Sequence, residues 1–325
     1  MLKINDRLRP VDLKGRIERL WHASAEKILE IDRRDSPGRG APVFTTEGKY
    51  TARGWTEWTQ GFAYGSALLQ FDAQWDERFL ELGRERTFAR MAQHITHVGV
   101  HDHGFNNVST YGNLWRLMSE GRIPENRREG DCYELALKCS GAVQAARWTF
   151  ISNGDGFIHS FNGPHSLFAD TIRSLRPLAL SHQLGHVLMG EHDEQISLLR
   201  RLVEHARTTA KWSVYYGGGR DAYDVRGRVA HESIFNVNDG SYRCPATQQG
   251  WSPFSTWTRG LAWIICGFAE LLEWIATRAD EELERLGGRE AIEALMLDAA
   301  AAASDFYIAN TVSYTHLTLP TKRIV

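Results

Sequence analysis

The chain has 325 residues, with 38 basic and 40 acidic side chains and a formal net charge of −2. This length suffices for one large domain or two, and the balanced charge excludes the basic stripe of a protein that binds nucleic acid or an anionic membrane. The four cysteines form no Cys-x-x-Cys pair, so we expect neither a zinc ribbon nor a disulfide framework, but reduced and mostly buried thiols.

The N-terminal segment is charged throughout and has no apolar run of the signal-peptide type. Nowhere does the chain approach the roughly 20 apolar residues that are needed to span a bilayer. We therefore expect a soluble cytoplasmic protein without a membrane partner.

Apolar residues at helical spacing dominate the chain from its start, where they predict a helix over residues 11–31. Residues 35–53, rich in Gly, Pro and Thr, predict a loop. The same spacing predicts further helices over residues 55–75, 77–98, 107–120, 131–152, 167–189, 192–212, 256–277 and 280–307. Between them, apolar alternation on both sides of Asn238-Asp239-Gly240 predicts one β-hairpin within residues 215–248.

About nine helices and one inserted hairpin define an all-α protein. The aromatic and carboxylate motifs fall at helix starts, which an (α/α)6 barrel gathers at one end of two concentric helical rings. The helices are fewer than such a barrel needs, and the helical period stops near residue 310. We expect a single barrel domain over residues 1–310 that lacks its last helices. Residues 311–325 resemble translated sequencing-adaptor read-through and are expected to be a non-native tail. The alternative is a natural extended tail, because chain termini often lack a pattern.

The segment from Gln248 to Trp263 concentrates aromatic side chains around one cation. It contains Gln249, Trp251, Phe254, Trp257, Arg259 and Trp263. Aromatic faces pack against the C–H side of a sugar ring, and a guanidinium binds a carboxylate through paired hydrogen bonds, so this segment suits an acidic carbohydrate. The alternative is that the aromatic residues are helix core and Arg259 is a surface charge, because Trp257 and Leu261 recur at helical spacing.

Two aspartates are candidates for proton transfer. Asp102 lies in a His-Asp-His-Gly-Phe turn, and Asp170 begins a helix after a Gly-rich loop. Two carboxylates in one cleft suit general acid and base catalysis, because unequal burial separates their pKa values. The alternatives are ordinary: Asp102 caps a helix, and Asp170 pairs with Arg173 one turn on.

Five histidines have the spacing of candidate metal ligands. His97, His101 and His103 are closely spaced, and His182 and His186 share a helix face. No His-Glu-x-x-His motif is present and no third ligand is apparent, so we expect neither a metal nor a cofactor.

The motifs resemble those of glycoside hydrolase family 88, the unsaturated glucuronyl hydrolases, with the related family 105 second. The run Trp257-Thr258-Arg259-Gly260-Leu261-Ala262-Trp263 is similar to the family's Trp-Ala-Arg-Gly-Gln-Ala-Trp, and His101-Asp102-His103-Gly104-Phe105 is similar to its His-Asp-Leu-Gly-Phe. Trp58-Thr59-Gln60-Gly61-Phe62 matches the family's N-terminal Trp-Thr-x-Gly-Phe. The resemblance covers most of residues 55–310.

This resemblance implies an (α/α)6 barrel and a metal-free hydrolase. Its substrate would be an oligosaccharide, left by a polysaccharide lyase, with a 4,5-unsaturated uronic acid at the non-reducing end. Asp170 would be the general acid and base that hydrates the C4=C5 enol ether, and Asp102 would assist as the second carboxylate. The substrate contacts implied are Trp58, His231, Gln249, Trp257, Arg259 and Trp263. The competing readings are an unsaturated rhamnogalacturonyl hydrolase of family 105 type and a non-catalytic carbohydrate-binding barrel.

Overall fold

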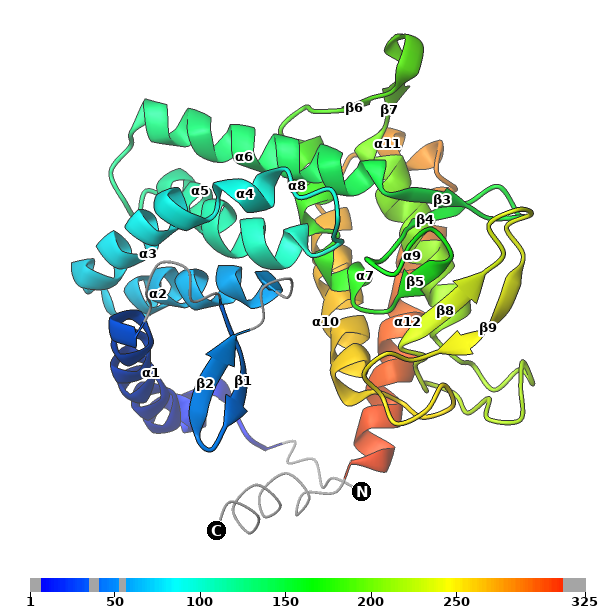
Figure 1. Cartoon of the computed structure of the whole chain (residues 1–325), viewed down its shortest axis with the longest axis horizontal. Helices are drawn as coiled ribbons and strands as arrows, with labels where there is room; N and C mark the ends of the chain where they lie inside the picture. Colours follow the sequence, from blue (N-terminus) through cyan, green and yellow to red (C-terminus); the bar gives the residue numbers. More distant parts are fainter. Residues whose placement is uncertain (1–6, 35–40, 53–56, 312–325) are drawn as a thin grey trace. The chain divides into compact units, whose positions relative to one another are not determined.

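The computed structural model describes residues 7–34, 41–52 and 57–311, and it consists mainly of helices with short strands between them (Figure 1). The described chain forms two compact units. The N-terminal unit comprises Leu8–Ala146 and Arg176–Leu198, and the C-terminal unit comprises Arg147–Leu175 and the chain from Leu199 onward, together with Arg7. Each unit is described in turn. In the described part of the chain, no helix is both long and apolar enough to cross a membrane.

The N-terminal unit is helical, with two small hairpins. Its helices are α1 (Lys14–Arg34), α2 (Gln60–Gln74), α3 (Glu77–Arg90), α4 (Ala92–Ile95), a π-helix (Gly104–Gly112), α5 (Asn113–Ser119), α6 (Arg127–Ala146) and α8 (Arg176–Gln183). Short 3-10 turns cover Pro10–Leu13, Glu57–Thr59 and Glu191–Asp193, and the hairpins pair β1 (Pro42–Thr46) with β2 (Lys49–Ala52) and β6 (Leu188–Met189) with β7 (Gln195–Ile196). Large apolar side chains such as Leu68, Phe71, Phe79, Leu114 and Tyr133 form its core.

Two glycines bring α2 against the π-helix. A Cβ at Gly61 would lie 2.3 Å from the Cα of Asn106, and one at Gly65 would lie 2.4 Å from the backbone oxygen of Ser109. Since the two glycines are four residues apart, they occupy one face of α2 and allow the two backbones to touch. Any larger residue at either position would force the π-helix away.

The C-terminal unit surrounds a three-stranded antiparallel sheet with helices. The strands of this unit are β3 (Trp148–Phe150), β4 (Gly156–Ile158), β5 (Ser166–Phe168), β8 (Glu232–Phe235) and β9 (Tyr242–Ala246). β3 pairs with β4 as a separate hairpin, and the three-stranded sheet has the order β5-β8-β9. The helices of this unit are α7 (Thr171–Ser174), α9 (Leu198–Ser213), α10 (Thr258–Ile275), α11 (Asp280–Glu284) and α12 (Arg289–Asn310). Phe157 and Phe235 meet at 4.9 Å in the core beneath the sheet. The packing of α10 on α12 and on α7 fixes the start of α7.

The predicted hairpin is confirmed as β8–β9, but the other strands were not predicted. Residues 41–52 form the hairpin β1–β2 where a loop was expected, with Glu47 and Gly48 at positive φ in its turn. Glycine and proline suggested a loop there, yet the Thr-rich flanks have the composition of strands.

Three predicted helices also have different ends. A helix was expected over residues 77–98, but α3 ends at Arg90, with the buried Met91 as its C-cap. The helices expected over 131–152 and 167–189 give way to β3 at one end and β5 at the other. Short apolar runs do not distinguish a buried strand from a helix, which is why these boundaries failed.

The cysteines correct another expectation. All four are free, but Cys132, Cys244 and Cys266 are exposed and Cys139 is only half-buried, so the prediction of mostly buried thiols was wrong. The expected non-native tail, from residue 312 onward, lies outside the described residues.

Candidate functional site

Strand β5 places Asp170 in the C-terminal unit. β5 pairs with β8 so that Phe168 faces Glu232, and the next residue, Ala169, donates its backbone N–H to the carbonyl of His231 at 2.9 Å. Asp170 then begins α7, as predicted, but its side chain makes no capping hydrogen bond to that helix. Asp170 therefore does not have the helix-capping role that carboxylates at helix starts often have.

The alternative for Asp170 was an ion pair with Arg173, but Arg173 has another acidic partner. Arg173 forms an ion pair with Glu270 of α10 at 3.0 Å. Gly267 of α10 lies so close to α7 that a Cβ there would be 2.8 Å from the backbone nitrogen of Arg173. These contacts hold the first turn of α7 against α10, so the position of Asp170 is fixed from both ends.

His231 connects the strand to the tryptophan segment. Its buried ring lies 4.1 Å from the ring of Trp257 and 4.8 Å from that of Phe168. Its Nδ1 accepts backbone N–H bonds from Gln248 at 3.2 Å and Gln249 at 3.4 Å. Because Nδ1 acts as an acceptor, it carries no proton, and Nε2 is the ring nitrogen that can donate.

Trp257, Arg259 and Gln249 form one group at the start of α10. The guanidinium of Arg259 lies 4.5 Å from the centre of the Trp257 ring and donates to Oε1 of Gln249. The Trp257 ring folds over Gly260, where a Cβ would lie 2.8 Å from the ring. Arg259 is exposed and Trp257 half-buried, so a cation and an aromatic ring face solvent together. Such a pair suits a ligand with an apolar face and a carboxylate.

Trp263 follows Arg259 by one turn of α10 and is half-buried. The other two aromatic residues of the predicted segment do not join this group. Trp251 is 96% exposed, and the ring of Phe254 stacks on Tyr223 at 4.6 Å. The core alternative therefore applies to neither of them.

A polar network around Glu232 was missed by the sequence analysis. The carboxylate of Glu232, which is buried, accepts hydrogen bonds from Ser166 at 2.5 Å and from Asn162 at 3.1 Å. Asn162 in turn accepts from Gln248 at 3.4 Å. The sequence carried a signal: an acidic residue inside an alternating apolar strand beside His231 is expected to be buried and hydrogen-bonded.

The second candidate carboxylate lies in the N-terminal unit. His101, Asp102 and His103 form a buried turn, and the carbonyl of Asp102 accepts the N–H groups of Phe105 at 3.0 Å and Asn106 at 3.2 Å, which begins the π-helix. π-helical turns are frequent at functional sites because they redirect side chains. The half-buried Trp58 lies 5.9 Å from the Phe105 ring, so the structure brings Trp58 beside the Asp102 turn.

Side chains of α6 and the backbone carbonyl of His97 fix this turn. His103 hydrogen-bonds Ser140 through Nδ1 at 3.0 Å and the carbonyl of His97 through Nε2 at 3.0 Å, so it offers no ring nitrogen to a metal ion. Gln144 donates to the carbonyl of His101 at 3.0 Å. Asp102 is thereby held by hydrogen bonds to the residues on either side of it.

A third histidine completes the support. The His94 ring bonds Gln60 through Nε2 at 2.7 Å and Asn106 through Nδ1 at 3.0 Å. Burial lowers the pKa of His94 to about 4, so the ring is neutral at physiological pH. The network thus joins α2, α4 and the π-helix without a buried charge.

The structure therefore assembles two groups of the predicted site residues. Asp170, His231, Gln249, Trp257, Arg259 and Trp263 belong to the C-terminal unit, and Trp58 and Asp102 belong to the N-terminal unit. Within the first group, His231 contacts Trp257 and the backbone of Gln249, and its carbonyl accepts the N–H of Ala169, the residue before Asp170. That both groups line one cleft stays a prediction.

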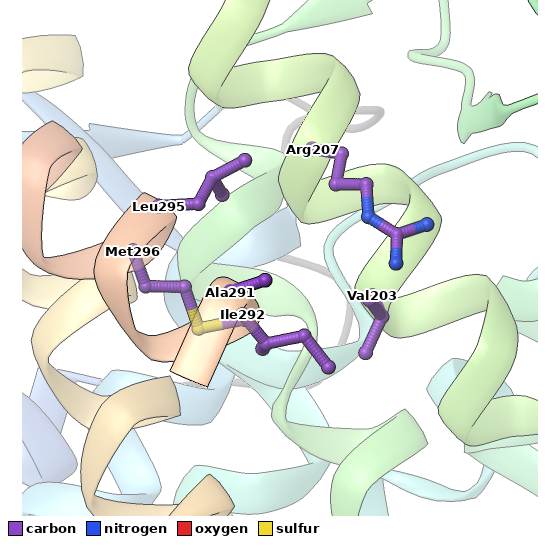
Figure 2. Close-up of a pocket in the computed structure, with 6 residues that line it drawn as sticks. All are labelled: Val203, Arg207, Ala291, Ile292, Leu295 and Met296. Atoms are coloured by element: carbon purple, nitrogen blue, oxygen red, sulfur yellow. The ribbon is translucent and has the colours of Figure 1, made fainter. Parts of the chain in front are cut away.

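A separate pocket of about 140 Å³ lies between α9 and α12 (Figure 2). It is lined by Val203, Arg207, Ala291, Ile292, Leu295 and Met296. The guanidinium of Arg207 donates to the carbonyl of Leu286 and forms an ion pair with Asp155 at 3.5 Å, so the cation in this pocket ties α9 to its neighbours. None of the predicted site residues lines the pocket.

The fold is that of the unsaturated glucuronyl hydrolases. A member specific for heparin matches with a TM-score of 0.65 and 18% identity over 89% of this chain and 66% of its own. The enzyme from Bacillus sp. GL1, responsible for the degradation of glycosaminoglycan, matches with a TM-score of 0.65 and 21% identity, over 90% of this chain and 68% of its own. A variant from Streptococcus agalactiae in complex with dGlcA-GalNAc6S matches at 0.53 and 18%, over 90% of this chain and 63% of its own.

These matches confirm the all-α, barrel-like fold that the sequence predicts. The chain spans about two thirds of the length of these structures. No protein-family model and no curated protein matches the chain.

Proposed function

We propose that the chain is a glycoside hydrolase that removes a 4,5-unsaturated uronic acid from the non-reducing end of oligosaccharides produced by polysaccharide lyases. One observation carries the proposal: Asp170 follows a strand that is bonded to His231, whose ring packs on Trp257 beside Arg259 and Gln249. A carboxylate, an aromatic face and a guanidinium in one group match the chemistry of an acidic sugar. The solved structures of the same fold are unsaturated glucuronyl hydrolases.

Asp170 supplies the proton transfers in this proposal. Its carboxyl group protonates C4 of the enol ether, and its carboxylate then removes a proton from the water that attacks C5. The hemiketal formed at C5 opens, and the anomeric carbon releases the remaining sugar chain. The same oxygen atoms act first as an acid and then as a base, so Asp170 ends the cycle as it began.

The other residues bind and orient the uronate. Arg259 and Gln249 hold its carboxylate and hydroxyl groups, and Trp257 and Trp263 pack on its C–H faces. His231 presents Nε2–H as a donor, because its Nδ1 is occupied by backbone N–H groups. Asp102 is the second carboxylate and hydrogen-bonds the sugar ring, with Trp58 stacking beside it.

The test is the variant Asp170→Asn. The amide has the same shape but transfers no proton, so turnover should be lost while oligosaccharide affinity changes little. Turnover is followed by the loss of the ultraviolet absorbance of the conjugated uronate with lyase-generated disaccharides. Asp305→Asn, an exposed aspartate on α12, is the matched control and should retain activity.

The outcomes separate the competing functions. Near-normal turnover by Asp170→Asn removes Asp170 from its role. Binding without turnover by the unaltered chain would indicate a non-catalytic carbohydrate-binding barrel. A preference for disaccharides with rhamnose next to the uronate would indicate the rhamnogalacturonyl type.

A further inference from the structure

Three aromatic side chains of the C-terminal unit are exposed although none belongs to the group around Arg259. Trp251 is 96% exposed, Tyr223 is 52% exposed and Phe254 is 43% exposed. The Tyr223 and Phe254 rings stack on each other, with centroids 4.6 Å apart and planes inclined by 26°. We call the stacked pair, together with Trp251, the outer platform. Large aromatic surfaces left in water are informative because their burial would be favourable.

A buried charged cluster holds the stacked pair from behind. The buried Arg228 donates to the carbonyl of Phe254, lies over the Tyr215 ring at 4.0 Å and approaches Asp221 to 3.7 Å. Asp221 accepts the backbone N–H of Tyr223 at 2.7 Å and the hydroxyl of Tyr215 at 2.8 Å. One cluster therefore fixes both loops that carry the stacked rings, so the stacked pair is in position before any ligand binds.

Two members of the outer platform, Trp251 and Phe254, share a loop with the candidate uronate site. Phe254 lies three residues before Trp257 on the same loop, and three residues span at most ~11 Å. A tight turn shapes the segment between Trp251 and Trp257, because Ser252 accepts the backbone N–H of Ser255 at 3.1 Å and Ser255 returns a side-chain bond to Ser252. A chain molecule held at Trp257 therefore passes within reach of the platform.

We propose that the outer platform is a subsite for the sugars that follow the terminal uronate in a longer oligosaccharide. This inference rests on the proposed function and extends it to substrate length. The occupant is a carbohydrate because the platform offers flat aromatic faces, which pack on sugar C–H groups, and because its loop also carries Trp257 and Gln249. The platform makes the chain a binder of tetrasaccharides and longer chains in preference to disaccharides.

The experiment measures affinity by calorimetry for an unsaturated disaccharide and for the tetrasaccharide of the same repeating unit. The unaltered chain should bind the tetrasaccharide about tenfold more tightly, as expected for burying one further aromatic face. Phe254→Ala should remove that gain and leave disaccharide affinity unchanged. Trp251→Ala should weaken tetrasaccharide binding severalfold, and it cannot unfold the protein because its side chain makes almost no contacts.

The control is Phe150→Ala, another exposed aromatic residue of the same unit, which lies on β3 and should bind both ligands normally. Equal affinity of the unaltered chain for both lengths, or equal losses for both in the variants, would overturn the subsite. A shift in sedimentation by Trp251→Ala, without a change in tetrasaccharide affinity, would also overturn it and identify a contact between copies of the chain.

The two proposals fail in different ways. If the disaccharide is turned over but length has no effect, the hydrolase stands and the subsite falls. If length affects binding but neither ligand is turned over, the hydrolase falls and the subsite stands. If neither ligand binds, both fall.

Discussion

Arg259 is the residue whose chemistry the sequence defines most clearly. It lies over Trp257 and hydrogen-bonds Gln249, so two neighbours hold the guanidinium in one orientation. Its planar fork fits a carboxylate through two parallel hydrogen bonds, which a lysine cannot make. The residue type and the spacing from Trp257 were enough to predict this group.

Arg259→Ala should therefore raise the KM for an unsaturated uronate strongly and lower kcat less. Loss of a charge-assisted hydrogen bond costs roughly 1.5–3 kcal/mol, which is about ten- to a hundredfold in affinity. Arg259→Lys keeps the charge and should recover only part of the loss. The measurement is steady-state kinetics, with Arg243→Ala, an exposed arginine of β9, as the control. Full recovery by lysine would show that the charge alone matters.

The lowered pKa of His94 leads to a prediction about the stability of the fold rather than about turnover. The pKa of this histidine is lowered to about 4 by burial, from a usual value of 6.5. Between these two values the unfolded chain binds a proton that the folded chain does not, so stability is complete above pH 6.5 and falls as the pH drops toward 4. The loss amounts to about 3 kcal/mol once both states are protonated.

Urea unfolding at several pH values measures this loss. In His94→Gln the titrating ring is absent, so the part of the acid dependence between pH 6.5 and 4 that His94 supplies should disappear, although the variant starts from a lower stability. An unchanged slope in the variant would assign the acid sensitivity to other groups. The histidine was visible in the sequence, but its burial among Gln60 and Asn106 was not, because that contact joins three elements.

At the scale of secondary-structure elements, the glycines of α2 determine how closely this helix packs against the π-helix. Gly61→Ala places a methyl group 2.3 Å from the Cα of Asn106, where only backbone can yield. The substitution should destabilise the protein by roughly 1–3 kcal/mol and disturb the Asp102 turn. Gly15→Ala in α1 is the matched control, because nothing lies within 4 Å of its Cβ. It should raise stability by up to about 1 kcal/mol.

Thermal or denaturant unfolding of the two variants gives the comparison. If Gly61→Ala lowers the free energy of unfolding and Gly15→Ala raises it, the close approach of the π-helix, and not helix propensity, determines the effect at Gly61. The resemblance to a Trp-Thr-x-Gly-Phe motif had marked Gly61, but helical periodicity alone gives a glycine no packing role. Only the tertiary contact explains why this position excludes a side chain.

Element types were predictable where the apolar period runs long. The helices at α1, α9, α10 and α12 and the hairpin β8–β9 follow from periodicity and from the Asn-Asp-Gly turn. The short strand β5 did not, because three residues gain their strand character from pairing with β8, which lies far along the sequence. Since β5 is what delivers Asp170, the most important local structure of the candidate site was the hardest to predict.

At the scale of the whole molecule, the all-α fold followed from the sequence. The division of the predicted site residues between two compact units did not. Helix count and motif position indicated the barrel class, which solved structures of the same fold confirm. The sequence contains no distances, so the assignment of Asp102 and Asp170 to one cleft rested on the expected barrel and on the family resemblance. The networks around Glu232 and His94 depend on pairs of residues distant in the chain, and no local pattern encodes them.

The whole molecule also offers a test of the ligand class that needs no turnover. A ligand that binds only the folded chain raises its stability by RT ln(1 + [L]/Kd), which is about 2.7 kcal/mol at a hundredfold excess over Kd. An unsaturated uronate disaccharide should therefore raise the unfolding temperature by several degrees, whereas a neutral disaccharide of equal size should not, because it lacks the carboxylate that Arg259 binds. The same measurement on Asp170→Asn should give the full shift, since that variant loses proton transfer but keeps the binding group, while Arg259→Ala should give a much smaller one. If the neutral sugar stabilises the chain equally well, the carboxylate is not what the group around Trp257 recognises, and the assignment of an acidic substrate fails even if the fold assignment holds.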